Sequence, residues 1–408
     1  MTVETLRSHF PILSEKIPGG GLVYLDNAAT SQRPLEVVSA YSELSLHRNA
    51  NIHRAVHYLS NVATKEYEDA RDAVKNFIGA ASREEIIFTS GATASINAVA
   101  FSFGEAFVHE GDEIILTEEE HHSNIVPWQM MASRKGATIK VLPVDDRGEL
   151  RVEKLSGLIS PRTRILALSH VSNVLGLVNP IKEIIAEAHS RGVRVLVDGA
   201  QGIVHQKVDV QDLDCDFYVF SGHKFYAAPF TGVLYGRKDL LEAMPPYMGG
   251  GEMIDSVSLA KGTTYAPLPA KFEAGTQNLA GAPTLKAAID FMKEAESPEI
   301  RSNLLDIRDY IYDALTSDKR IRLYGTPKSR EKKIPLFSFT VEGAHHEDLA
   351  LILDKMGIAV RSGQMCAEPL MDRFGVSGML RASFAPYNTI DEAKYFIESL
   401  GRAINMLI

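Results

Sequence analysis

The sequence predicts an α/β fold in which a large domain with a mostly parallel central sheet, covered by helices, is followed by a smaller α+β domain. Two observations support the large domain. Short apolar segments typical of buried strands recur along the chain, at residues 85–89, 113–117, 138–142, 164–169, 193–197, 217–220 and 231–235. Helical periodicity separates them, as in residues 59–78, and this alternation is typical of a helix-covered parallel sheet.

The pattern changes past about residue 295. A long polar helix is expected at residues 297–315. After it we expect a strand at 336–341, a helix at 346–356, strands near Ile358 and Leu380, and a last helix at 391–406. Residues 244–281 contain three successive glycines and little regular period, so we expect a long functional loop. We therefore divide the chain into an N-terminal segment that packs with the small domain (1–22), a large domain (23–292) and a small C-terminal domain (293–408).

Composition excludes several classes of function. The 408 residues are 45% apolar and 23% charged, as in ordinary globular proteins, and the formal charge is −9 with scattered basic residues, so we expect no nucleic-acid partner. Residues 165–181 form a stretch without Lys, Arg, Asp or Glu, but polar residues and Pro180 interrupt it, so no membrane span is expected. Residues 1–17 lack the apolar core of a signal peptide, and we expect a cytoplasmic protein.

Only two cysteines occur, Cys215 and Cys366. Two thiols support neither a disulfide framework nor a thiolate metal cluster. Cys215 adjoins a predicted buried strand and is interpreted as a packing residue. Cys366 lies between Gly363 and Pro369, which indicates a loop and argues against a buried inert thiol.

Polar residues follow the predicted strands, at the sheet edge where α/β proteins bind ligands. Residues 90–93 (SGAT) begin a helix and suit an anion such as phosphate, although a plain helix cap is the simpler interpretation. His121 follows another strand, where it could stack on a ring or move a proton. Asp198 and Lys224 each follow a buried strand; a buried carboxylate needs a partner, and a desolvated lysine is a candidate nucleophile. A helix cap and a solvated lysine are the alternatives.

Taken together, these residues point to pyridoxal phosphate. This cofactor needs a lysine that binds it covalently, an acid for its ring nitrogen, a ring to stack on and a phosphate site. Lys224, Asp198 and His121 provide the first three, and residues 90–93 with Ser221 and His223 provide the fourth. No metal site is expected, because the histidines lack ligand spacing.

The chain resembles the SufS-type (group II) cysteine desulfurases and selenocysteine lyases, within the class V aminotransferase-like family. The resemblance spans nearly the whole sequence and is carried by residues 24–30 (YLDNAAT), 121–129 (HHSNIVPWQ), 170–176 (HVSNVLG), 197–201 (VDGAQ), 214–224 (DCDFYVFSGHK), 272–276 (FEAGT), 361–363 (RSG) and 366–367 (CA). It implies a fold-type I pyridoxal phosphate-dependent transferase that forms a homodimer.

The resemblance also implies a role for each site residue. Lys224 would bind the cofactor and act as base, Cys366 would receive sulfur from L-cysteine as a persulfide, and His121 would stack on the cofactor. The other cofactor-binding residues would be Asp198, Gln201, Thr93, Ser221, His223 and, from the second subunit, Thr276. Asn173, Arg361 and Arg381 would bind the substrate carboxylate. The products would be L-alanine and a persulfide for an acceptor protein of iron-sulfur cluster assembly or another sulfur pathway.

The sequence departs from this family at residues next to the site. Relatives usually have two histidines before the nucleophilic cysteine, where this chain has Gln364 and Met365, so acid-base help from those positions is absent. The sequence is compatible with three other hypotheses: a lyase acting on L-selenocysteine, an aminotransferase- or epimerase-like enzyme that does not need Cys366, and a non-catalytic sulfur carrier or scaffold. A fourth hypothesis is a metal hydrolase built on His121, His122 and His223, and the lack of ligand spacing argues against it.

Overall fold

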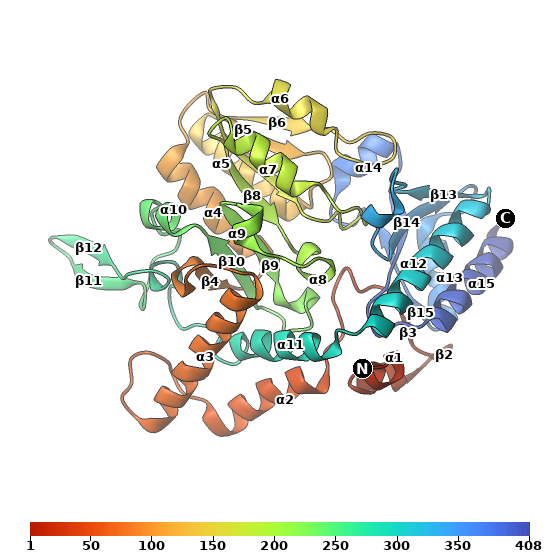
Figure 1. Cartoon of the computed structure of the whole chain (residues 1–408), viewed down its shortest axis with the longest axis horizontal. Coiled ribbons are helices and arrows are strands. Elements are labelled where there is room, and N and C mark those ends of the chain that lie inside the picture. Colours follow the sequence, from red (N-terminus) through yellow and green to blue (C-terminus); the bar gives the residue numbers. More distant parts are fainter.

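A seven-stranded sheet forms the centre of the larger part of the computed structural model, which describes residues 1–408 (Figure 1). Its strands, in spatial order, are β4 (Ile86–Thr89), β10 (Gly232–Gly236), β9 (Phe217–Ser221), β8 (Arg194–Asp198), β7 (Thr163–Ser169), β5 (Glu113–Thr117) and β6 (Thr138–Leu142). Only β10 runs antiparallel to its neighbours. All seven predicted strands are confirmed, with ends shifted by one residue at most.

Both faces of the inner strands of this sheet are buried. Along β7, Leu166 and Leu168 belong to one hydrophobic core, and Ile165 and Ala167 belong to the core on the other face. The first core is covered by α3 (Tyr58–Phe77), α7 (Ile181–His189) and α11 (Ala282–Ala295), and the second by α4 (Ala92–Phe107), α5 (Val126–Lys135) and α10 (Lys238–Ala243). Burial on both faces explains the nearly continuous apolar runs from which the strands were predicted.

The C-terminal part has its own antiparallel sheet and core. Its strands are β13 (Ile321–Tyr324), β14 (Leu336–Val341), β17 (Met379–Ser383) and β16 (Arg361–Gly363), in that order. Helices α12 (Pro298–Ser317), α13 (His346–Lys355) and α15 (Ile390–Leu407) contribute to a third hydrophobic core with this sheet. This separate core supports the boundary that we propose near residue 292.

The N-terminal segment contacts both parts of the chain. Arg7, in α1 (Val3–Ser8), pairs with Glu392 at 2.9 Å, and Gly19 lies so close to the small domain that a Cβ there would be 2.5 Å from the carbonyl oxygen of Lys355. Directly after the segment, β3 (Val23–Tyr24) pairs with β15 (Ile358–Ala359). These contacts support the proposed packing against the small domain. Leu6 and Phe10, however, belong to a core of the large sheet, so the segment also packs against the larger part.

Residues 244–281 are not a loop throughout, and that prediction was wrong for one stretch. β11 (Ile254–Ser258) and β12 (Gly262–Tyr265) form an antiparallel hairpin that projects from the molecule (Figure 1). Most of its residues are exposed, so the hairpin lacks the apolar alternation that reveals a half-buried strand.

Short elements complete the chain: β1 (Lys16–Ile17), β2 (Gly20–Gly21), α2 (Leu35–Glu43), α6 (Leu155–Leu158), α8 (Gly202–His205), α9 (Val210–Leu213) and α14 (Glu368–Phe374). None of the helices combines the length and apolar character needed to cross a membrane.

Candidate active site

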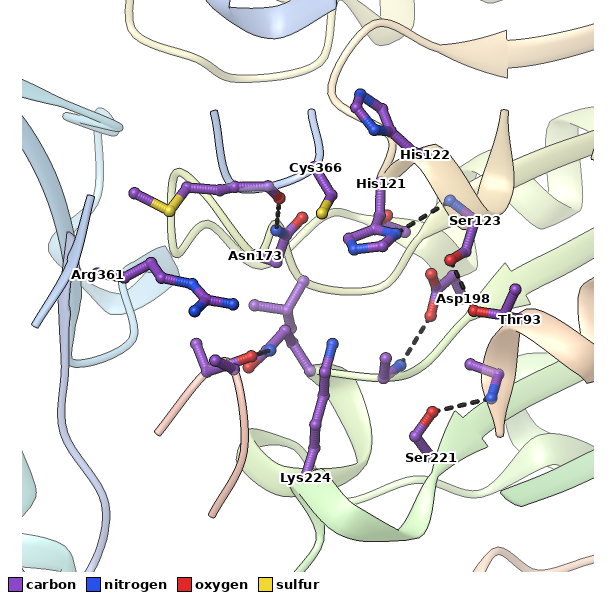
Figure 2. A pocket seen from close by; sticks show the side chains of 18 of the residues that line it. Thr93, His121, His122, Ser123, Asn173, Asp198, Ser221, Lys224, Arg361 and Cys366 are labelled. Atoms are coloured by element: carbon purple, nitrogen blue, oxygen red, sulfur yellow. Dashed lines mark hydrogen bonds between the residues drawn. The ribbon is translucent and has the colours of Figure 1, made fainter. Parts of the chain in front are cut away.

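A cavity of about 510 Å³ lies where several strands of the large sheet end. It is lined by every predicted site residue except Thr276. Figure 2 shows Lys224, Asp198, His121 and Cys366 reaching the same space from different segments. Thr276 lines a neighbouring cavity together with Ser90 and Ala94, close to the start of α4.

Lys224 and Asp198 influence each other's protonation. Lys224 follows β9 in a short turn, and desolvation lowers its pKa while the charge of Asp198 opposes that shift. Asp198 ends β8; burial raises the pKa of its carboxyl, and Lys224 and the backbone N–H of Ala200, which donates to Oδ1 at 2.9 Å, act in the opposite direction. A Cβ at Gly199 would lie 2.1 Å from the Tyr218 ring, so only glycine fits after Asp198.

The His121 ring is held in one tautomer. Its Nδ1 accepts a hydrogen bond from the backbone N–H of Ser123 at 3.0 Å. Burial and the charge of Lys224 lower its pKa to about 3. His121 is therefore neutral near pH 7 and carries its proton on Nε2.

His122 points elsewhere and contacts the loop that carries Cys366. Its backbone N–H donates to the carbonyl of Cys366 at 2.7 Å, and its Nε2 accepts from the backbone N–H of Glu368 at 3.0 Å. These contacts of His122 with Cys366 and Glu368 were not predicted from the sequence. The two adjacent histidines thus serve different parts of the site.

The residues predicted to bind a phosphate come together at the start of α4. Gly91 has a φ of 149°, and a Cβ on Gly232 of the adjacent strand would lie 2.3 Å from its Cα, so the two backbones touch. The backbone N–H of Ala92 donates to Ser221 Oγ at 2.8 Å, and Thr93 Oγ1 lies 2.7 Å from Ser123 Oγ. Hydroxyl groups gathered at a helix N-terminus are suited to bind a phosphate.

Two arginines converge on Asp26. Arg381 Nη2 lies 3.2 Å from Asp26 Oδ1, and Arg361 Nη1 lies 3.8 Å from Oδ2. Arg381 Nη1 donates to the backbone carbonyl of Asn173 at 2.8 Å, whereas its buried Nε has no partner. Both arginines line the cavity, and guanidinium groups there suit a carboxylate ligand. Asp26 belongs to the motif at residues 24–30, and its contact with Arg381 was not predicted from the sequence.

Comparisons with known proteins show the family to which the chain belongs. The model of the aminotransferase class-V family matches residues 23–396. Cysteine desulfurases of Pectobacterium carotovorum subsp. carotovorum and Serratia proteamaculans are each 47% identical over 405 residues, with 99% of this chain and 98% and 99% of their own lengths covered. The chain belongs to the cysteine desulfurases of the aminotransferase class-V family.

Solved structures place this cysteine desulfurase among the same proteins. The cysteine desulfurase CsdA of Escherichia coli matches with a TM-score of 0.91 and 40% identity, and both chains are covered completely. The apo cysteine desulfurase of Thermococcus onnurineus NA1 matches with a TM-score of 0.93 and 36% identity, over 100% of this chain and 99% of that one. A C-DES variant with glycine covalently linked to its PLP cofactor shares the fold, with a TM-score of 0.81 and 24% identity.

The two thiols of this cysteine desulfurase lie in different environments. Cys366 is exposed, lines the cavity and follows Met365 in a turn where both residues have positive φ, 53° and 55°. Asn173 Nδ2 donates to the Met365 carbonyl at 2.9 Å. Cys215 is 1% exposed in a hydrophobic core, where burial raises the pKa of its thiol. Only Cys366 can meet a substrate.

Proposed function

We propose that the chain removes sulfur from L-cysteine, releases L-alanine, and holds the sulfur as a persulfide on Cys366. The observation that carries this assignment is one cavity that contains both an exposed thiol and the Lys224–Asp198 pair. An enzyme that did not use a protein thiol would have no need of a cysteine at this position.

The residues of the cavity fit pyridoxal phosphate. Asp198 would face the ring nitrogen, the neutral His121 ring would stack on the cofactor, and Lys224 would hold it covalently. Gln201 Nε2 carries two hydrogens. One donates to the Ala28 carbonyl at 2.8 Å, and the other is available to the 3′-oxygen of the cofactor. The phosphate site would be formed by residues at the start of α4 and after β9, namely Thr93, Ser221 and His223, with Thr276 added by a second subunit. When bound, pyridoxal phosphate supplies an electron sink for the substrate carbon that bears the amino group.

Different residues of the chain would carry out the separate steps of the reaction. Arg381 and Arg361, with Asn173, would bind the substrate carboxylate. Lys224, whose lowered pKa favours the free amine, would act as the base that takes the proton from the α-carbon and carries it for a later protonation step. The Cys366 thiolate would attack the substrate sulfur, the C–S bond would break with its electron pair left on carbon, and a proton would complete alanine. One S–S bond replaces one C–S bond, so no external oxidant or reductant is needed.

Single substitutions test this assignment. Protein loaded with pyridoxal phosphate should convert L-cysteine to alanine and gain one sulfur atom on Cys366, seen by peptide mass spectrometry. Cys366→Ala should keep the visible cofactor absorption and lose persulfide, with alanine formation reduced at least about tenfold, whereas Lys224→Ala should lose the covalent cofactor absorption as well. Cys215→Ala is the matched control and should stay active. Undiminished alanine formation by Cys366→Ala would show that the proposed acceptor is wrong.

We further propose a homodimer and a protein acceptor for the sulfur. Several large apolar side chains are strongly exposed in the single chain, including Val56, Tyr58 and Phe230, and such surfaces favour an interface. Thr276 lines a second cavity beside Phe230, where it could reach the other subunit's site. Because Cys366 is exposed, an acceptor thiol could approach its persulfide directly.

A further inference from the structure

Residues 173–176, in the connection between β7 and α7, are held along their backbone by the small C-terminal part. Four successive carbonyls each accept a hydrogen bond from a donor that lies more than 150 residues further along the chain. The pairs are Asn173 O with Arg381 Nη1 (2.8 Å), Val174 O with Ser338 Oγ (2.6 Å), Leu175 O with Lys333 Nζ, and Gly176 O with the backbone N–H of Ile334 (2.9 Å).

Lys333 is an unusual donor, because its amine is buried without a carboxylate. The residue is 2% exposed, and its Nζ lies 5.3 Å from the centroid of the Phe337 ring. Burial lowers its pKa to about 7. Burying an amine costs free energy that a methionine of similar length would avoid, so packing alone does not account for a lysine here. Its specific contribution is the hydrogen bond to Leu175.

Residues 173–176 are linked by a hydrogen bond to the loop that carries Cys366. Asn173 lines the active-site cavity, and its side-chain amide donates to the carbonyl of Met365, the residue before Cys366. Met365 and Cys366 both have left-handed backbone conformations, which are unfavourable for residues with a Cβ and persist only where other contacts impose them. Asn173 provides one of these contacts, so a shift of residues 173–176 would move the Cys366 backbone.

We propose that Lys333 and Ser338 are positioning residues, which fix residues 173–176 and, through Asn173, the position of Cys366 relative to Lys224. The contribution of Lys333 and Ser338 to catalysis rests on the proposed function, in which Cys366 accepts the sulfur. Their effect on the position of Cys366 is independent of the proposed function, because it concerns the structure of the protein alone. Neither Lys333 nor Ser338 lines the cavity, so both act through the segment that they hold.

The test compares Lys333→Met and Ser338→Ala with Lys332→Met. Lys332 is the adjacent, exposed lysine, which pairs with Glu149 at 3.0 Å, so the control removes an amine without touching residues 173–176. The first readout is the rate at which iodoacetamide alkylates Cys366 in protein without cofactor, with buried Cys215 as internal reference. We expect a rise of about fivefold in both variants, as for loss of one hydrogen bond, and no change in the control.

The second readout uses the holoenzyme. The rate of persulfide formation in a single turnover should fall about fivefold or more, while the KM for L-cysteine changes less than twofold, because the arginines are retained. Variants that lower only the melting temperature, with alkylation and persulfide rates equal to the control, would overturn the proposal. If Lys333→Met does not fold, Ser338→Ala, which deletes a single oxygen, decides. Wild-type enzyme that forms no persulfide would refute the proposed function, and the alkylation rates would still decide the positioning role.

Discussion

Two adjacent carboxyl groups are buried beneath the cavity, on the segment that leads to His121. Glu120 accepts hydrogen bonds from Asn124 Nδ2 at 2.7 Å and from the backbone N–H and hydroxyl of Ser169, each at 2.8 Å. Glu119 accepts from Asn179 Nδ2, but its Oε2 is buried without a partner. Burial raises the pKa of Glu119 to about 8 and that of Glu120 to about 7. Ionisation of Glu119 is therefore opposed in the folded protein.

Replacing Glu119 by Gln should change how stability depends on pH. The folded protein keeps a proton on Glu119 that the unfolded chain loses above its ordinary pKa of 4.5, so stability falls as pH rises from about 5 to 8. Glu119→Gln lacks this penalty. The melting temperature of the variant minus that of the wild type should increase across this range and then level off, by calorimetry in matched buffers. Glu294→Gln, at an exposed position, is the control; a difference for Glu119→Gln that stays constant with pH would contradict the argument.

At the scale of elements, the sequence predicted what is buried and continuous. The inner strands β7, β8 and β9 were found because both of their faces are covered, which makes them apolar along most of their length, and β11 and β12 were missed because they are exposed. The site residues at strand ends were predictable, since parallel strands place their carboxyl ends at one edge.

Other parts of the site depend on residues far apart in the chain. Asp26 holds Arg381 across 355 positions, and Lys333 reaches Leu175 across 158. No local pattern marks such a pair, because a single carboxylate or lysine is ordinarily solvated. These contacts follow from the way the two parts of the chain dock.

One buried ion pair fastens α3 to the segment that carries Thr276. Arg71 is 1% exposed and binds both oxygens of Glu273, at 2.6 and 3.0 Å, and the backbone N–H of Phe88 donates to the same carboxylate at 2.7 Å. Arg71→Met would leave Glu273 buried without a cation, which should cost about 3–5 kcal/mol in the free energy of unfolding.

The control for Arg71→Met removes an exposed cation from the same helix. Lys65 pairs with Asp69 at 2.5 Å on the surface, and Lys65→Met should cost less than about 1 kcal/mol. Urea denaturation followed by circular dichroism measures both. Adding Glu273→Gln to Arg71→Met should recover part of the loss, since no buried charge then remains unpaired. If Arg71→Met and Lys65→Met lost the same free energy of unfolding, Arg71 and Glu273 would not be coupled as argued.

At the scale of the whole molecule, the N-terminal segment joins the two parts near the active site. Phe10 is 1% exposed, and its ring lies among those of Tyr226, Phe291 and Tyr387, at centroid distances of 6.2, 5.7 and 4.6 Å. Tyr226 follows Lys224 by two residues, Phe291 belongs to α11, and Tyr387 lies in the C-terminal part. Figure 1 shows the N-terminus next to α12, where these parts meet.

Truncating this ring should weaken both parts together. Phe10→Ala removes a fully buried aromatic side chain, which costs about 3–5 kcal/mol, and we expect a lower melting temperature by calorimetry. Hydrogen exchange should then quicken around Tyr226 and around Tyr387, while strands remote from Phe10, such as β5 and β6, keep their protection. Ile12→Ala, at a position 41% exposed, is the control and should leave exchange unchanged. Faster exchange around only one of the two tyrosines would mean that Phe10 stabilises a single domain, and the joining role would be lost.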